Sequence, residues 1–107
     1  IEYINKNHCI ALMIDQRVSE GERIDLFNKP ALTTTLPAQL AIKYKLPVIP
    51  VFIKRLNNNK FQIKFLEKIN YSNFKNTVEM SKRLNEVLEE MIVNNPNQWI
   101  WTHNRWK

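Results

Sequence analysis

The residues best placed for chemistry are Asp15 and Gln16, which directly follow the uninterrupted apolar run at residues 9–14. A short apolar run without alternation predicts a strand buried on both faces of an α/β sheet. Such sheets hold their binding sites at the carboxyl ends of strands. A carboxylate at this point could orient a histidine, bind a cation or accept hydrogen bonds from loop amides. An aspartate that only caps the loop explains the pattern equally well.

The other reactive side chains form no recognisable centre. His8 and His103 lie in no metal-ligand cluster, and Cys9 has no partner cysteine, so the sequence predicts neither a metal site nor an internal disulfide. The unpaired cysteine favours a reducing compartment, and Cys9 itself is expected in the core. With one glycine, Gly21, the chain can form neither a glycine-rich phosphate loop nor a Gly-x-Ser-x-Gly nucleophile elbow.

Helices are predicted in three places around these residues. Residues 1–7 are interpreted as the end of a helix. The threonines at 33–35 can cap a short apolar helix that stops at residues 46–47. Residues 74–93 carry apolar side chains at helical spacing, which predicts an amphipathic helix closed by Asn94, Asn95 and Pro96.

The remaining segments predict a loop and two further strands. Residues 17–32 are polar and are interpreted as a long loop, which inside a compact domain is often functional. Residues 48–53 predict a second apolar strand, with a bulge or an unpaired position at Pro50. Residues 60–66 alternate between apolar and polar side chains and predict a half-buried strand. Three asparagines at 57–59 predict the turn that joins these two strands into a hairpin.

Charge and length limit the classes of function. The 107 residues fit one small domain or part of a larger one, and no apolar run approaches the roughly 18 residues of a membrane span. The net charge is +6, and residues 40–78 alone hold eight basic residues and one acidic residue. This balance favours an anionic partner, such as nucleic acid, phospholipid headgroups or an acidic carrier protein. A lysine-rich solvated surface explains it equally well.

The chain ends in a densely aromatic stretch. Residues 98–107 contain Trp99, Trp101 and Trp106 together with basic side chains. Tryptophan next to basic residues suits a membrane–water interface. Packing against the rest of the domain is the better default for such side chains.

Four stretches, in this order, resemble the C-terminal third of the bacterial lipid A biosynthesis acyltransferases, the lauroyl and myristoyl transferases. They are DQ at 15–16, FNKPALT at 27–33, PVIPVF at 47–52 and PNQWIWTHNRWK at 96–107. The Asp-Gln pair is weak alone, whereas the tryptophan-rich ending is specific, and the ordered set spans essentially the whole chain. The resemblance implies a glycerolipid-acyltransferase-like α/β fold with a mixed central sheet flanked by helices.

The resemblance also implies an activity. Enzymes of this family work without a cofactor at the cytoplasmic face of the inner membrane. They pass an acyl chain from acyl carrier protein to a sugar-linked hydroxyl of a phosphorylated glycolipid, the lipid A precursor. A histidine followed five residues later by an acid acts as general base.

That dyad is missing from this sequence. Met13 lies five residues after His8, and the sequence stops before the fifth residue after His103. The chain also begins with Ile1 instead of methionine. We therefore expect residues 1–107 to be the C-terminal fragment of a single acyltransferase domain. This fragment would lack the catalytic histidine segment and the N-terminal membrane anchor, and would be inactive alone.

The family motifs transfer a modest set of site residues to this chain. Asp15 is expected to support the active site. The substrate-binding side is expected to consist of Gln16, Arg17, Phe27, Lys29 and Thr33. Arg17 stands where an acid is common in the family, and Asn28 stands where glycine is common, which puts close backbone approach to the substrate in doubt.

The main rival is a small basic nucleic-acid-binding domain. The basic middle carries Phe52, Phe61 and Phe65 on the predicted hairpin, and aromatic side chains there could stack on bases. These aromatic residues share the pattern of core residues, however, and no recognised DNA or RNA motif is present. We therefore expect acyl carrier protein, the glycolipid and an anionic membrane surface as partners, and no nucleic acid.

Overall fold

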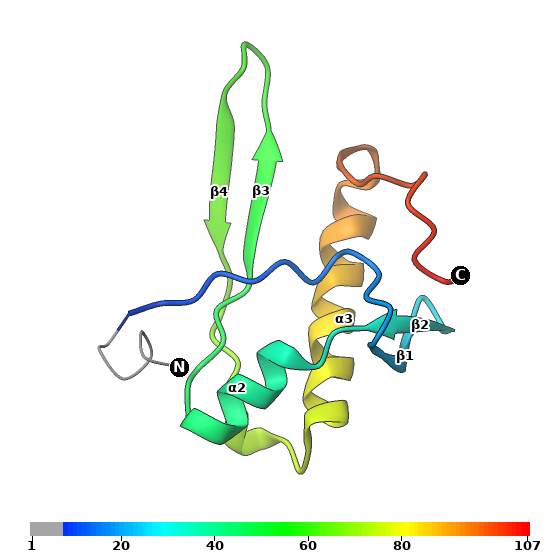
Figure 1. The fold of residues 1–107 in the computed structure, drawn as a ribbon. Helices are drawn as coiled ribbons and strands as arrows, with labels where there is room; N and C mark the ends of the chain where they lie inside the picture. Colours follow the sequence, from blue (N-terminus) through cyan, green and yellow to red (C-terminus); the bar gives the residue numbers. More distant parts are fainter. Residues whose placement is uncertain (1–7) are drawn as a thin grey trace.

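The computed structural model describes residues 8–107 (Figure 1). The helix end predicted at residues 1–7 lies outside this part. Along the described chain the elements are β1 (Glu22–Leu26), β2 (Lys29–Thr33), α2 (Leu36–Tyr44), β3 (Val51–Arg55), β4 (Phe61–Phe65), η1 (Tyr71–Asn73), α3 (Thr77–Asn94) and η2 (Pro96–Gln98). The predicted α/β class is confirmed. Within residues 8–107 the strands form two separate antiparallel pairs, β1–β2 and β3–β4.

Helix α3 is the element against which α2 and the β1–β2 hairpin pack. The side chain of its N-cap, Asn76, accepts a hydrogen bond from the Glu79 amide at 2.9 Å, and the Glu79 carboxylate accepts one from the Lys75 amide at 2.8 Å. The first bond satisfies an amide that the first helical turn leaves free, and the second ties the residue before the N-cap to this turn. The helix ends at Asn94, before Pro96, as its sequence predicts.

Two apolar clusters lie along α3. Near its beginning, Met80 packs with Ala38 and Ala41 of α2. Near its end, buried side chains of α3 meet those of the β1–β2 hairpin; the cluster comprises Leu26, Ala31, Leu88 and Ile92. The hairpin that carries part of the predicted site is therefore anchored on the C-terminal half of α3.

Helix α2 confirms the predicted short helix after the three threonines. Its N-cap is Thr35, whose side chain caps no helix amide but accepts a hydrogen bond from Gln39 at 2.8 Å, whereas the Thr34 hydroxyl accepts one from the Leu36 amide at 3.3 Å. Pro37 sits in the first turn, where its missing N–H costs nothing. The helix stops at Lys45, whose φ of 56° places it in the left-handed region.

The prediction of a loop throughout residues 17–32 is wrong. Strands β1 and β2 pair antiparallel with Leu26 opposite Lys29, so Phe27 and Asn28 alone make the turn. Both turn residues have positive φ, 53° and 57°, which matches the right-handed twist of a two-residue hairpin. Asparagine tolerates this region better than most residues, and the same requirement explains why glycine suits the position of Asn28.

Gly21 lies against the backbone of β2 just before β1 begins. A Cβ atom at this position would lie 2.6 Å from the Thr33 carbonyl oxygen and 2.8 Å from the Thr33 amide nitrogen. Because both neighbours are backbone atoms, they cannot rotate away as a flexible side chain could.

We therefore expect Gly21→Ala to lower the free energy of unfolding by about 1–3 kcal/mol, the usual cost of overpacking. Urea denaturation measures this loss. Glu20→Ala, in the exposed turn beside it, is the control and should stay within about 0.5 kcal/mol of the unaltered protein. An unchanged midpoint for Gly21→Ala would show that the close approach to Thr33 does not exist.

The predicted β3–β4 hairpin is confirmed, and it projects away from the rest of the fold (Figure 1). Asn58 and Asn59 have positive φ in its turn. The interruption expected at Pro50 is also present, because Val48 makes an isolated bridge with Ile69 and the regular ladder starts only at Val51.

The half-buried character predicted for residues 60–66 is wrong. Every residue of β4 is exposed. One face of the hairpin is apolar, and each of its side chains is more than two-fifths exposed; they are Val51, Ile53, Phe61, Ile63 and Phe65. The alternating pattern identified the strand correctly, but no described element covers this face.

The strand predicted at residues 9–14 is absent, and the prediction of a core position for Cys9 is wrong. The segment has no regular secondary structure, Cys9 is exposed, and Met13 is 80% exposed. An apolar segment becomes a strand only when a neighbour supplies backbone hydrogen-bonding partners. Neither described sheet pairs with this segment.

Candidate functional site

The segment that carries Asp15 lies against the C-terminal tail, residues 99–107. The Arg17 amide donates to Nε2 of His103 at 2.9 Å, and the Arg17 Nε donates to the Lys107 carbonyl at 2.9 Å. Asp15 is half-buried. The tail is therefore bonded to this segment at Arg17, the residue that directly follows Asp15 and Gln16.

Arg105 connects this segment to the β1–β2 hairpin. Its side chain is 0% exposed. The guanidinium donates to the Leu32 carbonyl, to the Thr33 hydroxyl at 3.1 Å and to the Ile14 carbonyl at 3.5 Å. Burial lowers the pKa of Arg105, while the negative charge of Asp15 acts in the opposite direction. Asp15 is thus the charged group that favours the ionised guanidinium.

The side chain of Thr33 is the centre of a buried polar cluster. Its hydroxyl donates to the Ala31 carbonyl at 3.1 Å and accepts from Arg105 and from Nδ2 of Asn85, the latter also at 3.1 Å. The same Asn85 amide group donates to the Asp25 carbonyl at 3.0 Å. The hydroxyl of Thr33 consequently faces the interior, where three internal bonds occupy it.

The turn of the β1–β2 hairpin is fixed from α3 and from the tail. Oε1 of Glu89 accepts the Phe27 amide at 2.6 Å, which stabilises a backbone conformation that is unusual for an aromatic residue. The Phe27 ring lies 6.5 Å from that of Trp106, whose Nε1 donates to the Leu26 carbonyl at 3.0 Å. Nothing in the sequence marked Glu89 for this role apart from its position on the polar face of the predicted helix.

The tryptophans of the tail divide into two kinds. Trp99 and Trp106 meet edge to face at 6.1 Å and pack on the cluster beneath the hairpin, so packing, the default expectation, is confirmed for these two. Trp101 stacks edge-on against Trp99 at 4.8 Å but remains 55% exposed.

The structure thus gathers four of the six predicted site residues around the tail. Asp15, Arg17, Phe27 and Thr33 each contact it or are electrostatically coupled to it. Gln16 and Lys29 are exposed. Sequence reasoning missed Arg105, because its role depends on partners at least 72 residues away.

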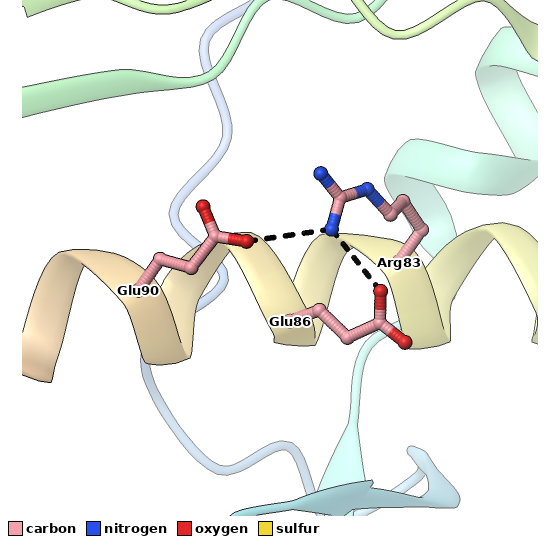
Figure 2. A network of polar contacts seen from close by, with 3 residues as sticks. All are labelled: Arg83, Glu86 and Glu90. Atoms are coloured by element: carbon pink, nitrogen blue, oxygen red, sulfur yellow. Dashed lines mark hydrogen bonds and ion pairs between the residues drawn. The ribbon is translucent and has the colours of Figure 1, made fainter.

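Other polar groups lie outside this cluster. On the surface of α3, Arg83 pairs with Glu86 at 3.1 Å and with Glu90 at 3.5 Å (Figure 2). These side chains are about half exposed, and such surface pairs contribute little to stability. Within residues 8–107 no three His, Cys, Asp or Glu side chains gather in a way that would hold a metal ion.

A shallow groove separates the β3–β4 hairpin from the C-terminal end of α3. Its lining combines apolar and charged side chains: Phe52, Lys54, Gln62, Lys64, Leu66, Glu90, Met91, Asn94 and Asn95. Gln98, which follows α3, connects to the hairpin, since its side-chain amide exchanges hydrogen bonds with the Arg55 backbone at 3.0 and 3.3 Å. Neither α-helix within residues 8–107 has the length and hydrophobicity needed to cross a membrane.

Comparison with known proteins identifies one family. The model of the bacterial lipid A biosynthesis acyltransferases matches residues 1–107. No curated protein matches the chain.

Proposed function

Because the chain belongs to the family of bacterial lipid A biosynthesis acyltransferases, we propose a specific reaction for the full-length protein that carries these 107 residues. It moves a fatty acyl chain from acyl carrier protein to a hydroxyl of a phosphorylated glycolipid, the lipid A precursor. One observation beyond the family match supports this proposal. Arg105, in the stretch at 96–107, donates to Leu32 and Thr33 of the stretch at 27–33 and to the carbonyl of Ile14, directly before the stretch at 15–16.

The proposed chemistry is base-catalysed acyl transfer. A neutral imidazole takes the proton of the glycolipid hydroxyl, and the oxygen attacks the thioester carbonyl carbon. A carbon–oxygen bond forms, the carbon–sulfur bond breaks, and the thiol of the carrier leaves with the proton. His103 is unsuited to this task because its Nε2 already accepts the Arg17 amide. We place the base in a His-x4-Asp/Glu segment upstream of residue 1.

This placement makes the chain the C-terminal part of one larger acyltransferase domain. Two exposed apolar surfaces support it, the outer face of the β3–β4 hairpin and the segment at residues 9–14. Exposed apolar surface of this extent marks a contact with other protein or with lipid. In the complete domain, the mixed central sheet of the family fold would bring such surfaces against neighbouring elements.

Each predicted site residue receives a role in this proposal. Asp15 supports the active site, and Gln16 and Phe27 border the acceptor. Lys29 and Arg17 are exposed and can meet the phosphate groups of the glycolipid. The hydroxyl of Thr33 is bonded internally, so Thr33 supports the substrate-binding residues through these bonds and does not contact the substrate through its hydroxyl.

In this proposal the basic segment at residues 40–78 binds the acyl carrier protein, which is the acyl donor, and the anionic membrane surface. Lys54 and Lys64 line the groove beside α3 together with apolar side chains, a combination that suits an acidic carrier protein or lipid headgroups. Each basic residue near an anionic surface contributes about 1 kcal/mol to binding. The corresponding location is the cytoplasmic face of the inner membrane.

One observation favours the rival function, binding of single-stranded nucleic acid. Phe61 and Phe65 are exposed, so they are available to stack on bases. Titration with an oligonucleotide at increasing salt separates the two functions, because nucleic-acid affinity would fall steeply with salt. Family membership favours the glycolipid, and we expect no such binding.

A transfer assay tests the proposed function. We expect the full-length protein to add an acyl chain from acyl carrier protein to the lipid A precursor, detected as the corresponding mass increase of the glycolipid. We expect the 107-residue chain alone to show no transfer, because it lacks the His-x4-Asp/Glu base. Transfer by the 107-residue chain would disprove the assignment of the base to an upstream segment. Failure of the full-length protein with this donor and acceptor would disprove the proposed reaction.

A further inference from the structure

We propose that Arg105 is a positioning residue, which holds the Asp15 segment against the β1–β2 hairpin so that Asp15 can act in acyl transfer. The catalytic part of this inference rests on the proposed function. The structural part rests on the contacts of residues 8–107 alone.

The side chain of Arg105 links the Asp15 segment to strand β2. Its guanidinium reaches the Ile14 carbonyl on one side and the Leu32 carbonyl and Thr33 hydroxyl on the other. Arginine suits such a bridge better than lysine, because its five donors lie in one rigid plane, whereas lysine offers a single ammonium group that can keep only part of these contacts. The residue directly before Asp15 is thereby tied to β2.

The tail holds the other side of the same segment. His103 and Lys107 accept hydrogen bonds from the amide and the Nε of Arg17. Asp15 and Gln16 thus lie between two fixed points, at Ile14 and at Arg17. Backbone held at both ends gives a carboxylate a defined position, which is what a supporting group in an active site needs.

Burial argues for a role of the charge itself. Arginine is almost never fully buried without partners, and a well-packed apolar side chain usually stabilises a core as well as a buried charge does. Arg105 is nevertheless fully buried, with Nε unpartnered among the described residues. The negative charge of Asp15 favours the ionised guanidinium, an interaction that an apolar side chain at this position could not make.

Hydrogen exchange on the full-length protein tests the structural part. We expect Arg105→Gln to speed amide exchange in a peptide covering residues 14–17 by at least about tenfold, because the bond from Arg105 to the Ile14 carbonyl, which ties this segment to β2, is lost. Arg83→Gln is the matched control. It removes an arginine whose two carboxylate partners lie with it on the surface of α3 (Figure 2) and should leave this peptide unchanged. Unchanged exchange at residues 14–17 in Arg105→Gln would overturn the inference.

Kinetics test whether Arg105 acts through Asp15. We expect Arg105→Gln to lower kcat about 10- to 100-fold with little change in KM, and the double variant with Asp15→Asn to lose no more than Asp15→Asn alone. If the losses in kcat of the two single variants multiply in the double variant, Arg105 acts independently of Asp15. That result would overturn the inference.

Arg105→Lys distinguishes loss of the bridge from a failure to fold, because it keeps the positive charge but lacks the planar guanidinium group. We expect it to restore part of the exchange protection and part of kcat; values equal to those of Arg105→Gln in both would also count against the inference. If the unaltered protein transfers no acyl chain, the proposed function fails, and the exchange result still decides whether Arg105 fixes the segment.

Discussion

Replacing Asp15 with alanine in the full-length protein is expected to lower kcat for acyl transfer by about 100-fold or more while leaving the fold intact. Asp15 is half-buried and coupled to the charge of Arg105, so it is placed to orient or stabilise groups that react. Contributions of positioned acid–base and electrostatic groups commonly reach about 10²–10⁴ in rate. Steady-state transfer kinetics with acyl carrier protein as the donor measure the effect.

Asp25→Ala is the matched control for this variant. Asp25 is an exposed aspartate of β1 whose backbone carbonyl, and not its carboxylate, accepts the bond from Asn85. We expect its kcat to equal that of the unaltered protein. Near-normal turnover of Asp15→Ala would remove Asp15 from the site, provided that circular dichroism shows a folded variant.

The largest expected effect on stability is that of Trp106→Ala, a loss of about 3 kcal/mol in the free energy of unfolding. The indole packs on the cluster of Leu26, Leu88 and Ile92, meets Trp99 edge to face, and donates to the Leu26 carbonyl. Alanine would remove this contact area and leave a buried carbonyl without its donor. Urea denaturation followed by circular dichroism measures the loss.

Trp101→Ala serves as the comparison, because Trp101 belongs to the same tail and is 55% exposed. Its Nε1 donates to the Pro96 carbonyl at 2.6 Å, so we expect a loss of about 1 kcal/mol. Equal losses for the two variants would mean that Trp106 is not the anchor of the tail.

Local signals in the sequence located most of the regular elements. The 3.6-residue period of α3 and its closing Asn-Asn-Pro predicted that helix nearly to its ends, and the asparagine run predicted the turn between β3 and β4. The β1–β2 hairpin was missed because its turn, Phe27-Asn28, carries only one residue typical of positive φ. The two-residue spacing of Ile24 and Leu26 was the available signal.

Errors in burial have a different origin, since they depend on what lies next to an element. Residues 9–14 have the composition of a buried strand, and β4 has the alternation of a half-buried one, yet residues 9–13 and all of β4 are exposed in the described structure. Hydrophobic pattern specifies which side chains should be covered but not which element covers them. The motif stretches marked Asp15, Phe27 and Thr33 as site residues, whereas Arg105 lies in the stretch at 96–107 but received a role only from contacts distant in sequence.

The way the tail bonds to the rest of the chain has a consequence for biosynthesis. Arg105 meets Ile14 across 91 residues and Leu32 across 73, and Trp106 meets Leu26 across 80. Translation delivers residues 103–107 after all of these partners, so the Asp15 segment cannot be locked while residues 8–102 are being made. Contacts of such long sequence separation form slowly because a large loop must close first. Until the tail docks, the nascent chain therefore exposes the apolar cluster that Trp99 and Trp106 later cover, which is the interval in which it would depend most on chaperones.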